Sequence, residues 1–292
     1  MPFRAKLRGQ IWGPEPRHAV YAALLVLLLG ILLIWPLFQV VAAGFLSSAG
    51  HFTTAYLRLV LANPVVLHGL SKATWIAFAT TSLSLLLALP LAVLTSRFEF
   101  PGRALLSALL LLPMVLPPFV GAIGMRLLLG RFGPLTQVFG PASSRGIDWL
   151  GNLRVFGVIG VEALSLYPIV LLNLQAALAN IDPVLERAAA NLGAARWRVF
   201  QRVTFPLVRP GLFAGCTLVF IWSFTELGTP LMFHVFDVTP VQVFNSIVEL
   251  DSPLPYALVV VMLAGSSALY VLGKVTLGRQ NRALASKSAS SG

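Results

Sequence analysis

Two carboxylates inside apolar stretches, Glu162 and Glu226, are the residues of this 292-residue sequence that come nearest to a chemical site. An ionisable group in such a segment is costly and usually serves a function. The pair could act as a general acid and base. However, no Gly-x-Ser-x-Gly turn and no Gly-x-x-x-x-Gly-Lys-Ser/Thr phosphate loop accompanies it. We therefore predict no catalytic residue, and any nucleotide would have to be bound by another subunit.

Metal-binding patterns are missing as well. A zinc-binding helix needs two histidines at i, i+4 spacing with a carboxylate between them, and this pattern occurs at none of the four histidines: His18, His51, His68 and His234. The single cysteine, Cys216, excludes a cysteine-rich zinc site and a disulfide within the chain. We therefore expect no metal site and no cofactor.

The composition points to a membrane as the main solvent. Hydrophobic residues make up 57% of the chain and charged residues 11%, whereas soluble domains carry about 25% charged residues. Backbone groups in a bilayer must be paired within their own segment, which favours helices. Six stretches are long and apolar enough to cross a hydrocarbon core about 30 Å thick: 19–46, 69–94, 104–129, 156–179, 211–233 and 256–277. We predict an all-α, polytopic protein with six transmembrane helices.

The basic residues indicate the orientation of these helices. Six spans place both termini on one side, and that side carries 15 of the 21 Lys and Arg residues, against 6 on the other. The positive-inside rule therefore predicts that both termini are cytoplasmic. The net charge of +11 is a topology signal, and nucleic acid is not expected as a partner. We predict a cytoplasmic tail over 1–18, a membrane domain over 19–277 and a disordered cytoplasmic tail over 278–292.

The cytoplasmic loop 181–210 has the most specific pattern. Asp182 is a helix N-cap followed by Pro183 at the first helical position, and Gly193 suits the left-handed turn that ends a helix. A second short helix is expected over 196–204, stopped by the prolines that follow it. Taken alone, the loop could be an amphipathic helix pair lying at the membrane surface.

Within this loop, residues 186–206 resemble the EAA loop of binding-protein-dependent ABC importer permeases. The motif's two alanines are matched by Ala188 and Ala189, its glycine by Gly193 and its proline by Pro206. Its glutamate position is occupied by Arg187, and Glu186 stands immediately before it.

Three further segments resemble permeases for molybdate, sulfate, polyamines and iron(III): 100–103, 112–135 and 223–229. The resemblance implies the type I importer fold, with two permease subunits forming the pathway. It also implies cytoplasmic ABC ATPase subunits that bind ATP, a solute-binding protein outside, and a location in the bacterial cell (inner) membrane. The coupling residues expected on this basis are Glu186, Arg187, Ala188, Ala189, Gly193, Trp197, Arg198, Arg202 and Pro206.

Breaks in the apolar spans suggest a translocation pathway. A bend near Glu226, with Thr225 and Gly228 beside it, could expose backbone to water, as could the prolines Pro117 and Pro118. Packing kinks and structural hydrogen bonds explain the same residues equally well. Glu162 is expected in the outer interface.

The remaining expectations concern cargo and partners. The outer segments 140–152 and 237–255 are natural docking surfaces for a binding protein, and 52–67 is expected to be an outer interfacial helix. Within the family the resemblance favours iron(III), ahead of polyamine, phosphonate, thiamine, sulfate and molybdate. A stand-alone channel or secondary transporter is the alternative from another class.

Overall fold

The computed structural model describes residues 16–47, 50–130, 133–134, 154–248 and 254–289. Regular structure in these ranges is helical, apart from one β-bridge between Leu46 and Phe52. Five helices are long and apolar enough to cross a membrane, and a sixth span results if one bent helix pair is counted as a unit. The predicted all-α, polytopic fold is confirmed. Most of the tail 1–18 and the outer segment 140–152 lie outside the described residues.

Three long helices form the centre of the bundle: α5 (Pro64–Arg97), α9 (Arg154–Ala179) and α12 (Phe205–Thr225). The buried face of α5 consists mainly of small residues at intervals of three or four, including Ala73, Ala77, Ser84 and Ala88. Small side chains let helix backbones approach closely in a membrane protein. The facing side of α9 supplies larger buried residues such as Leu171, so the two surfaces fit together.

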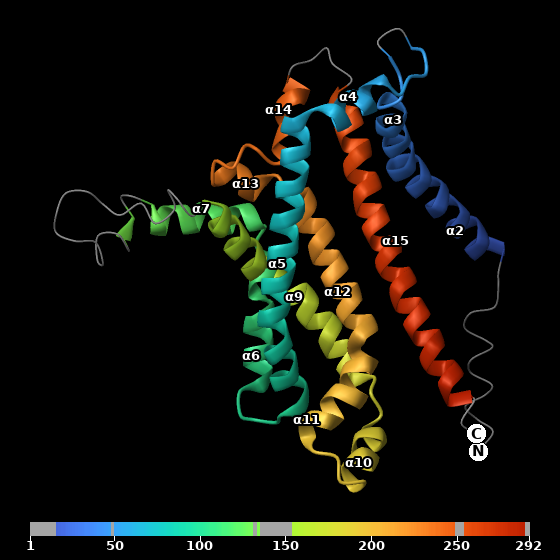
Figure 1. The fold of residues 1–292 in the computed structure, drawn as a ribbon, viewed down its shortest axis with the longest axis vertical. Helices are drawn as coiled ribbons and strands as arrows, with labels where there is room; N and C mark the ends of the chain where they lie inside the picture. Colours follow the sequence, from blue (N-terminus) through green and yellow to red (C-terminus); the bar gives the residue numbers. More distant parts are fainter. Residues whose placement is uncertain (1–15, 48–49, 131–132, 135–153, 249–253, 290–292) are drawn as a thin grey trace.

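The elements around this centre define two ends of the molecule (Figure 1). At the end that we call the loop end, α9 leads through α10 (Pro183–Asn191) and α11 (Arg196–Val199) into a π-helical turn, η3 (Phe200–Thr204), and then α12. The opposite end carries α4 (Ala55–Ala62) and α14 (Thr239–Val248). Helix α5 begins at the opposite end and finishes at the loop end, so it connects the two.

The third predicted span, 104–129, is not one straight helix. It consists of α6 (Arg103–Leu111), a 3₁₀ turn η2 (Leu112–Val115) and α7 (Pro118–Leu129), and the two halves meet at 92°. Proline lacks an N–H and its ring clashes with the preceding turn, and Pro113, Pro117 and Pro118 cluster at this point. As a result α7 leaves the bundle sideways in Figure 1.

The break at the prolines of the third span was expected, but the fifth span differs from the prediction. Helix runs without interruption over Arg196–Thr225, so the prolines at 206 and 210 do not separate a short helix from the span as we expected. The π turn explains this in part, since Phe205 N–H bonds to the Phe200 carbonyl one residue further back than in an α-helix. The span ends at Thr225, and α13 (Gly228–Met232) is a separate short helix.

The first and last helices flank this centre. Helices α2 (Pro16–Leu29) and α3 (Trp35–Ala43), joined by the π turn η1 (Gly30–Ile34), form an apolar span whose side chains are almost all exposed. Helix α15 (Leu254–Ala289) passes through the predicted last span and continues beyond 277. The tail expected to be disordered is therefore helical up to Ala289, because its alanines, leucine and basic residues favour helix and no proline interrupts them.

Candidate functional site

Helix α10 at the loop end has the boundaries that the sequence predicts. The Asp182 carboxylate accepts a hydrogen bond of 2.9 Å from the Val184 N–H, which makes it the N-cap. Gly193 ends the helix in the left-handed conformation with φ of +79°, and Ala194 N–H bonds back to the Ala189 carbonyl at 3.2 Å. Both ends of α10 are therefore fixed by local sequence.

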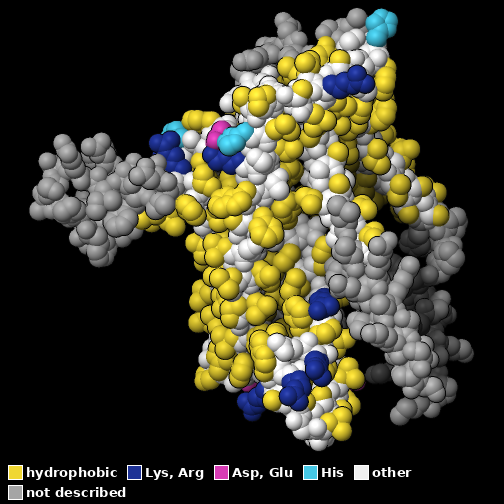
Figure 2. All heavy atoms as spheres, in the orientation of Figure 1, with side chains coloured by type: hydrophobic (Ala, Val, Ile, Leu, Met, Phe, Trp, Pro, Cys, Tyr) yellow, Lys and Arg dark blue, Asp and Glu magenta, His cyan; other side chains and the backbone are white. Residues whose placement is uncertain are grey.

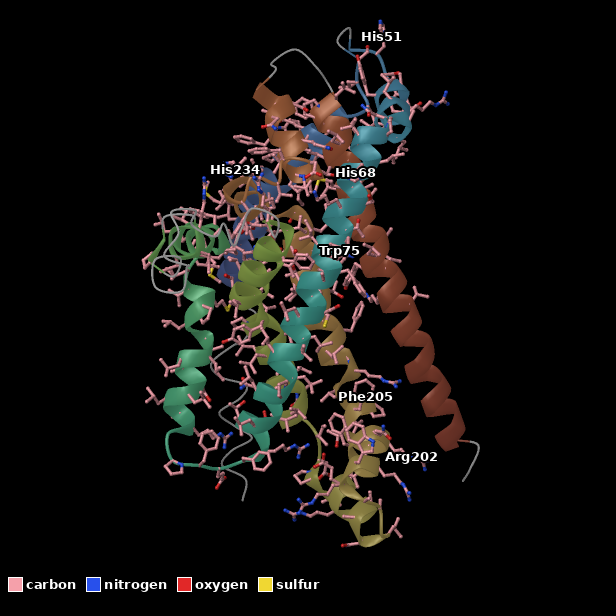
Figure 3. The ribbon with its side chains drawn as sticks, turned by 60° about the vertical axis from the view of Figure 1, so that its left-hand side comes forward. His51, His68, Trp75, Arg202, Phe205 and His234 are labelled. Carbon is pink, nitrogen blue, oxygen red and sulfur yellow. The ribbon has the colours of Figure 1, made fainter. Side chains whose placement is uncertain are left out.

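The surface of the loop is apolar with a basic rim. Leu192 is 89% exposed and Trp197 is 66% exposed, and Val184 also faces outward. Trp197 stacks on Phe200 with ring centroids 5.5 Å apart, and the Arg209 guanidinium lies 5.0 Å from the Phe205 ring. Figure 2 shows basic side chains gathered at this end, and Figure 3 places Arg202 and Phe205 there. Exposed apolar groups of this size mark a contact surface.

The predicted coupling residues divide by exposure. The exposed members are Arg187, Ala188, Gly193, Trp197, Arg198 and Arg202. Half-buried are Glu186, Ala189 and Pro206. Arg187, at the motif's glutamate position, therefore faces outward, whereas Glu186 turns toward the bundle.

Glu186 connects α10 to the bundle through polar contacts. Its carboxylate forms two hydrogen bonds with the Arg97 guanidinium, of 2.7 and 2.6 Å. The Thr204 hydroxyl donates a third, of 2.6 Å, to Glu186 Oε1. Arg97 is the last residue of α5 and Thr204 the last of η3. Neither was singled out in the sequence, because the two partners are 89 and 18 residues away from Glu186.

The predicted pathway residues lie around the end of α12. Glu226 has extended backbone, and its Oε1 accepts hydrogen bonds from the Gly228 and Thr229 N–H groups at 3.2 and 3.4 Å. The carboxylate thus caps α13. A Cβ atom on Gly228 would come within 2.8 Å of Phe119 Cβ, so α13 packs closely against the start of α7. The break expected near Glu226 is present.

The other three predicted pathway residues are spread out. Thr225 is exposed, bonds to the Ile221 and Trp222 carbonyls of its own helix, and lines a groove of about 290 Å³ beside α14 and α15. Pro117 is exposed and Pro118 is buried at the start of α7. The structure does not gather the five residues into one site in a single chain.

Glu162 is in the core, not in the outer interface that we expected. Its side chain is fully buried in α9, and Oε2 accepts hydrogen bonds from Thr80 of α5, at 3.3 Å, and from Ser223 of α12. The carboxyl group therefore bridges all three central helices. The sequence could not pair Glu162 with these two hydroxyl groups, because α5 contains several other Ser and Thr residues.

A second ionic cluster lies at the opposite end. Lys72 Nζ bonds to both carboxylate oxygens of Asp237, at 2.7 and 2.6 Å, and His68 Nε2 lies 3.6 Å from Asp237 Oδ2. Figure 2 shows acidic, basic and histidine side chains side by side there, and Figure 3 labels His68 and His234. Partial burial acts to raise the pKa of Asp237, but the hydrogen bond and charge of Lys72, with His68, outweigh it and hold that pKa below its ordinary value.

Comparison with known proteins places the chain in a family. Residues 84–282 match the family described as "binding-protein-dependent transport system inner membrane component". Because this match covers more than half of the chain, the protein belongs to that family of ABC importer permeases. The expectation drawn from the EAA-like loop is confirmed at this level.

Several relatives have named cargo. The chain is 33% identical to a probable molybdenum ABC transporter permease of Haloferax volcanii, over 86% of this chain and 89% of the relative. It is 36% identical to the molybdenum transport permease ModB of Escherichia coli K12, over 56% and 71%. A putative ferric transport permease of Haemophilus influenzae is 30% identical over 78% of this chain, which spans 35% of that protein.

Solved structures share the fold. A chain of a bacterial ABC transporter involved in the import of the acidic polysaccharide alginate superposes with a TM-score of 0.70 at 14% identity, over 89% of this chain and 95% of that one. Identity this low supports the fold alone. The chain therefore has the type I importer permease fold.

Proposed function

We propose that this chain is the membrane permease subunit of a binding-protein-dependent importer whose loop 181–210 docks on a separate ABC ATPase. The observation that carries the proposal is the loop itself, because α10 is capped at both ends and presents Leu192 and Trp197 to the surroundings. Exposed apolar groups that lie together in this way favour contact with a partner. In this proposal ATP is bound by the partner and no cofactor by this chain.

The remaining partners follow from the family and the topology. A second permease subunit, identical or related, completes the pathway, and a solute-binding protein delivers cargo at the opposite end. The complex is placed in the bacterial cell inner membrane with both termini in the cytoplasm, since most basic residues lie on the side of the loop. Membrane lipid surrounds the exposed apolar helices.

The loop residues have distinct proposed roles. Ala188 and Ala189 keep the helix narrow, so that it can enter a groove on the ATPase. Arg187, Arg198 and Arg202 supply charge at the rim, and Trp197 supplies apolar contact. Gly193 sets the turn between α10 and α11, and Pro206 lies at the start of α12, within its continuous helix.

The proposed cargo is an oxyanion of the molybdate type, in place of the iron(III) that the sequence favoured. The identities to relatives support it. The molybdenum permeases of Haloferax volcanii and Escherichia coli are 33% and 36% identical to this chain, and the ferric relative is 30% identical.

The pathway in this proposal runs past the end of α12. Glu226 is half-buried there and caps α13, which packs against α7 at Gly228. We propose that Thr225, Gly228 and the prolines Pro117 and Pro118 shape this region in the assembled dimer. Cargo would then pass where helices are interrupted and backbone groups are available to bind it.

The test is purification and uptake. The chain is expressed with the neighbouring ATPase gene, extracted in mild detergent, and assayed for co-purification and for uptake of labelled molybdate or ferric iron in cells lacking the subunit. Gly193→Val should abolish uptake, because valine is strained at positive φ. Gly50→Val is the matched control, since Gly50 has φ of +77° at the opposite end. Failure to recover an ATPase, with intact uptake in Gly193→Val, favours a channel or secondary transporter.

A further inference from the structure

Helix α10 is joined to the bundle by two short covalent connections that are not helical. At its start, residues 180–182 link it to α9 without helical structure, and at its end Leu192–Ala195 link it to α11 in the same way. Two connections define an axis about which a short rigid helix can rotate. A push or pull on the exposed face of α10 would then turn the helix instead of moving the bundle.

Packing does little to prevent this rotation. A cavity of about 380 Å³ lies between the loop and the ends of α5 and α9, lined by Val93, Leu178, Ala190 and Ala194, among others. Where the cavity lies, α10 has no close-packed support from the central helices. Its orientation must therefore depend on contacts at the cavity wall.

The contact at that wall is the three-residue cluster of Arg97, Glu186 and Thr204, all of which line the cavity. The pair is well formed: the guanidinium and carboxylate meet through two parallel hydrogen bonds, which fixes their relative orientation as well as their distance. The side chains of Arg97 and Glu186 are 30% and 21% exposed, so water screens them less than it screens a fully exposed pair. We call this cluster the loop clasp.

We infer that Arg97 of α5 is a positioning residue for coupling, because the loop clasp gives α10 its third attachment and passes movement of the loop to α5. The inference rests on the proposed function. A third attachment away from the axis stops the rotation, so that a displacement of α10 moves α5, α9 and α12 together. Glu186 thereby supplies the carboxylate of the loop, although Arg187 occupies the motif position.

The experiment measures coupling, not only activity. Permease variants Arg97→Gln, Glu186→Gln and the exchanged pair Arg97→Glu with Glu186→Arg are assembled with the ATPase in proteoliposomes. Molybdate uptake and ATP hydrolysis are measured together. The single variants should lower the molybdate carried per ATP by roughly fivefold or more, the low end of allosteric coupling factors, while hydrolysis continues. The exchanged pair should recover most of the ratio.

Controls distinguish failed assembly and failure of the proposed function from loss of the loop clasp. Arg103→Gln removes a basic residue at the same end, outside the clasp, and should leave the ratio unchanged. Co-elution of each variant with the ATPase shows that it is assembled. If the wild type neither binds the ATPase nor transports, the proposed function fails. If the wild type transports and both single variants assemble with an unchanged ratio, or the exchanged pair recovers nothing, the clasp inference is wrong.

Discussion

The two ends of α5 are each held by an ion pair, and the pairs differ in kind. At the loop end Arg97 meets Glu186 through a planar fork, with Thr204 as a third partner. At the opposite end Lys72 meets Asp237, and the Asp237 side chain is 48% exposed. A guanidinium fork fixes orientation, whereas an ammonium is a point charge that tolerates many geometries. The loop end is thus built for alignment and the opposite end for adjustable contact.

The largest predicted effect is a loss of stability at the loop end, where α12 packs closely against α9. Gly211 of α12 lies so close to α9 that a Cβ atom would be 2.6 Å from Ala177 Cβ and 2.9 Å from the Asn173 carbonyl oxygen. Overpacking of this kind costs about 1–3 kcal/mol. Gly211→Leu should therefore lower the thermal unfolding temperature of the detergent-solubilised complex. Gly265→Leu is the control, because nothing lies within 4 Å of its Cβ position; equal shifts for both would contradict the close α9–α12 contact.

The next prediction compares the contributions of the two ion pairs to coupling. Arg97→Lys keeps the charge but loses the fork, so the ratio of cargo to ATP should fall severalfold. Lys72→Arg at the opposite end should leave the ratio nearly unchanged. Uptake and hydrolysis in proteoliposomes measure both, and a similar loss in the two variants would remove the distinction between alignment and adjustable contact.

The stability contributed by the Lys72–Asp237 pair at the opposite end should depend on pH. The pKa of Asp237 is lowered in the folded protein, so its contribution to stability is complete above the ordinary value of 3.8 and is lost as pH falls through the lowered value. Thermal unfolding of the wild type and of Asp237→Asn is measured between pH 6 and about 3. Below about pH 4 the wild type should lose a small increment of stability, and Asp237→Asn should not. If the two curves run parallel, the pair does not stabilise this end.

The smallest effect is expected at Arg187. It is exposed and outside the loop clasp, so Arg187→Ala should change the cargo-to-ATP ratio less than twofold, while weakening ATPase binding slightly at low salt, as rim charges do. Binding of the purified ATPase at two salt concentrations measures this. A loss of coupling as large as in Glu186→Gln would show that coupling depends on Arg187 as well.

The sequence predicted features that depend on local residues. The apolar spans, the Asp182 cap and the turn at Gly193 follow from hydropathy and backbone preferences within a few residues, and the structure has them. The preference for iron(III) depended on resemblance of short segments, and the relatives include permeases for molybdenum, sulfate and ferric iron.

Features that depend on contacts distant in sequence were missed. Arg97 and Glu186 are 89 residues apart, and Thr80 and Glu162 are 82 apart, so spacing could not pair them. The prolines were a correct signal in the third span and a misleading one in the fifth. Those at 113, 117 and 118 bend the third span by 92°, whereas Pro206 and Pro210 remain within a continuous helix after a π turn. Proline's effect depends on whether the surrounding backbone can widen to accept its ring.

The central claim is that the loop contacts the ATPase, and cross-linking from Leu192 tests it most directly. Cys216 is first replaced by alanine, and Leu192→Cys and the control Phe52→Cys are then made, since both positions are well exposed at different ends. With a short cysteine-reactive cross-linker, Leu192→Cys should join to the ATPase in native membranes and Phe52→Cys should not. Absence of the Leu192→Cys product in membranes that contain both subunits would contradict the account.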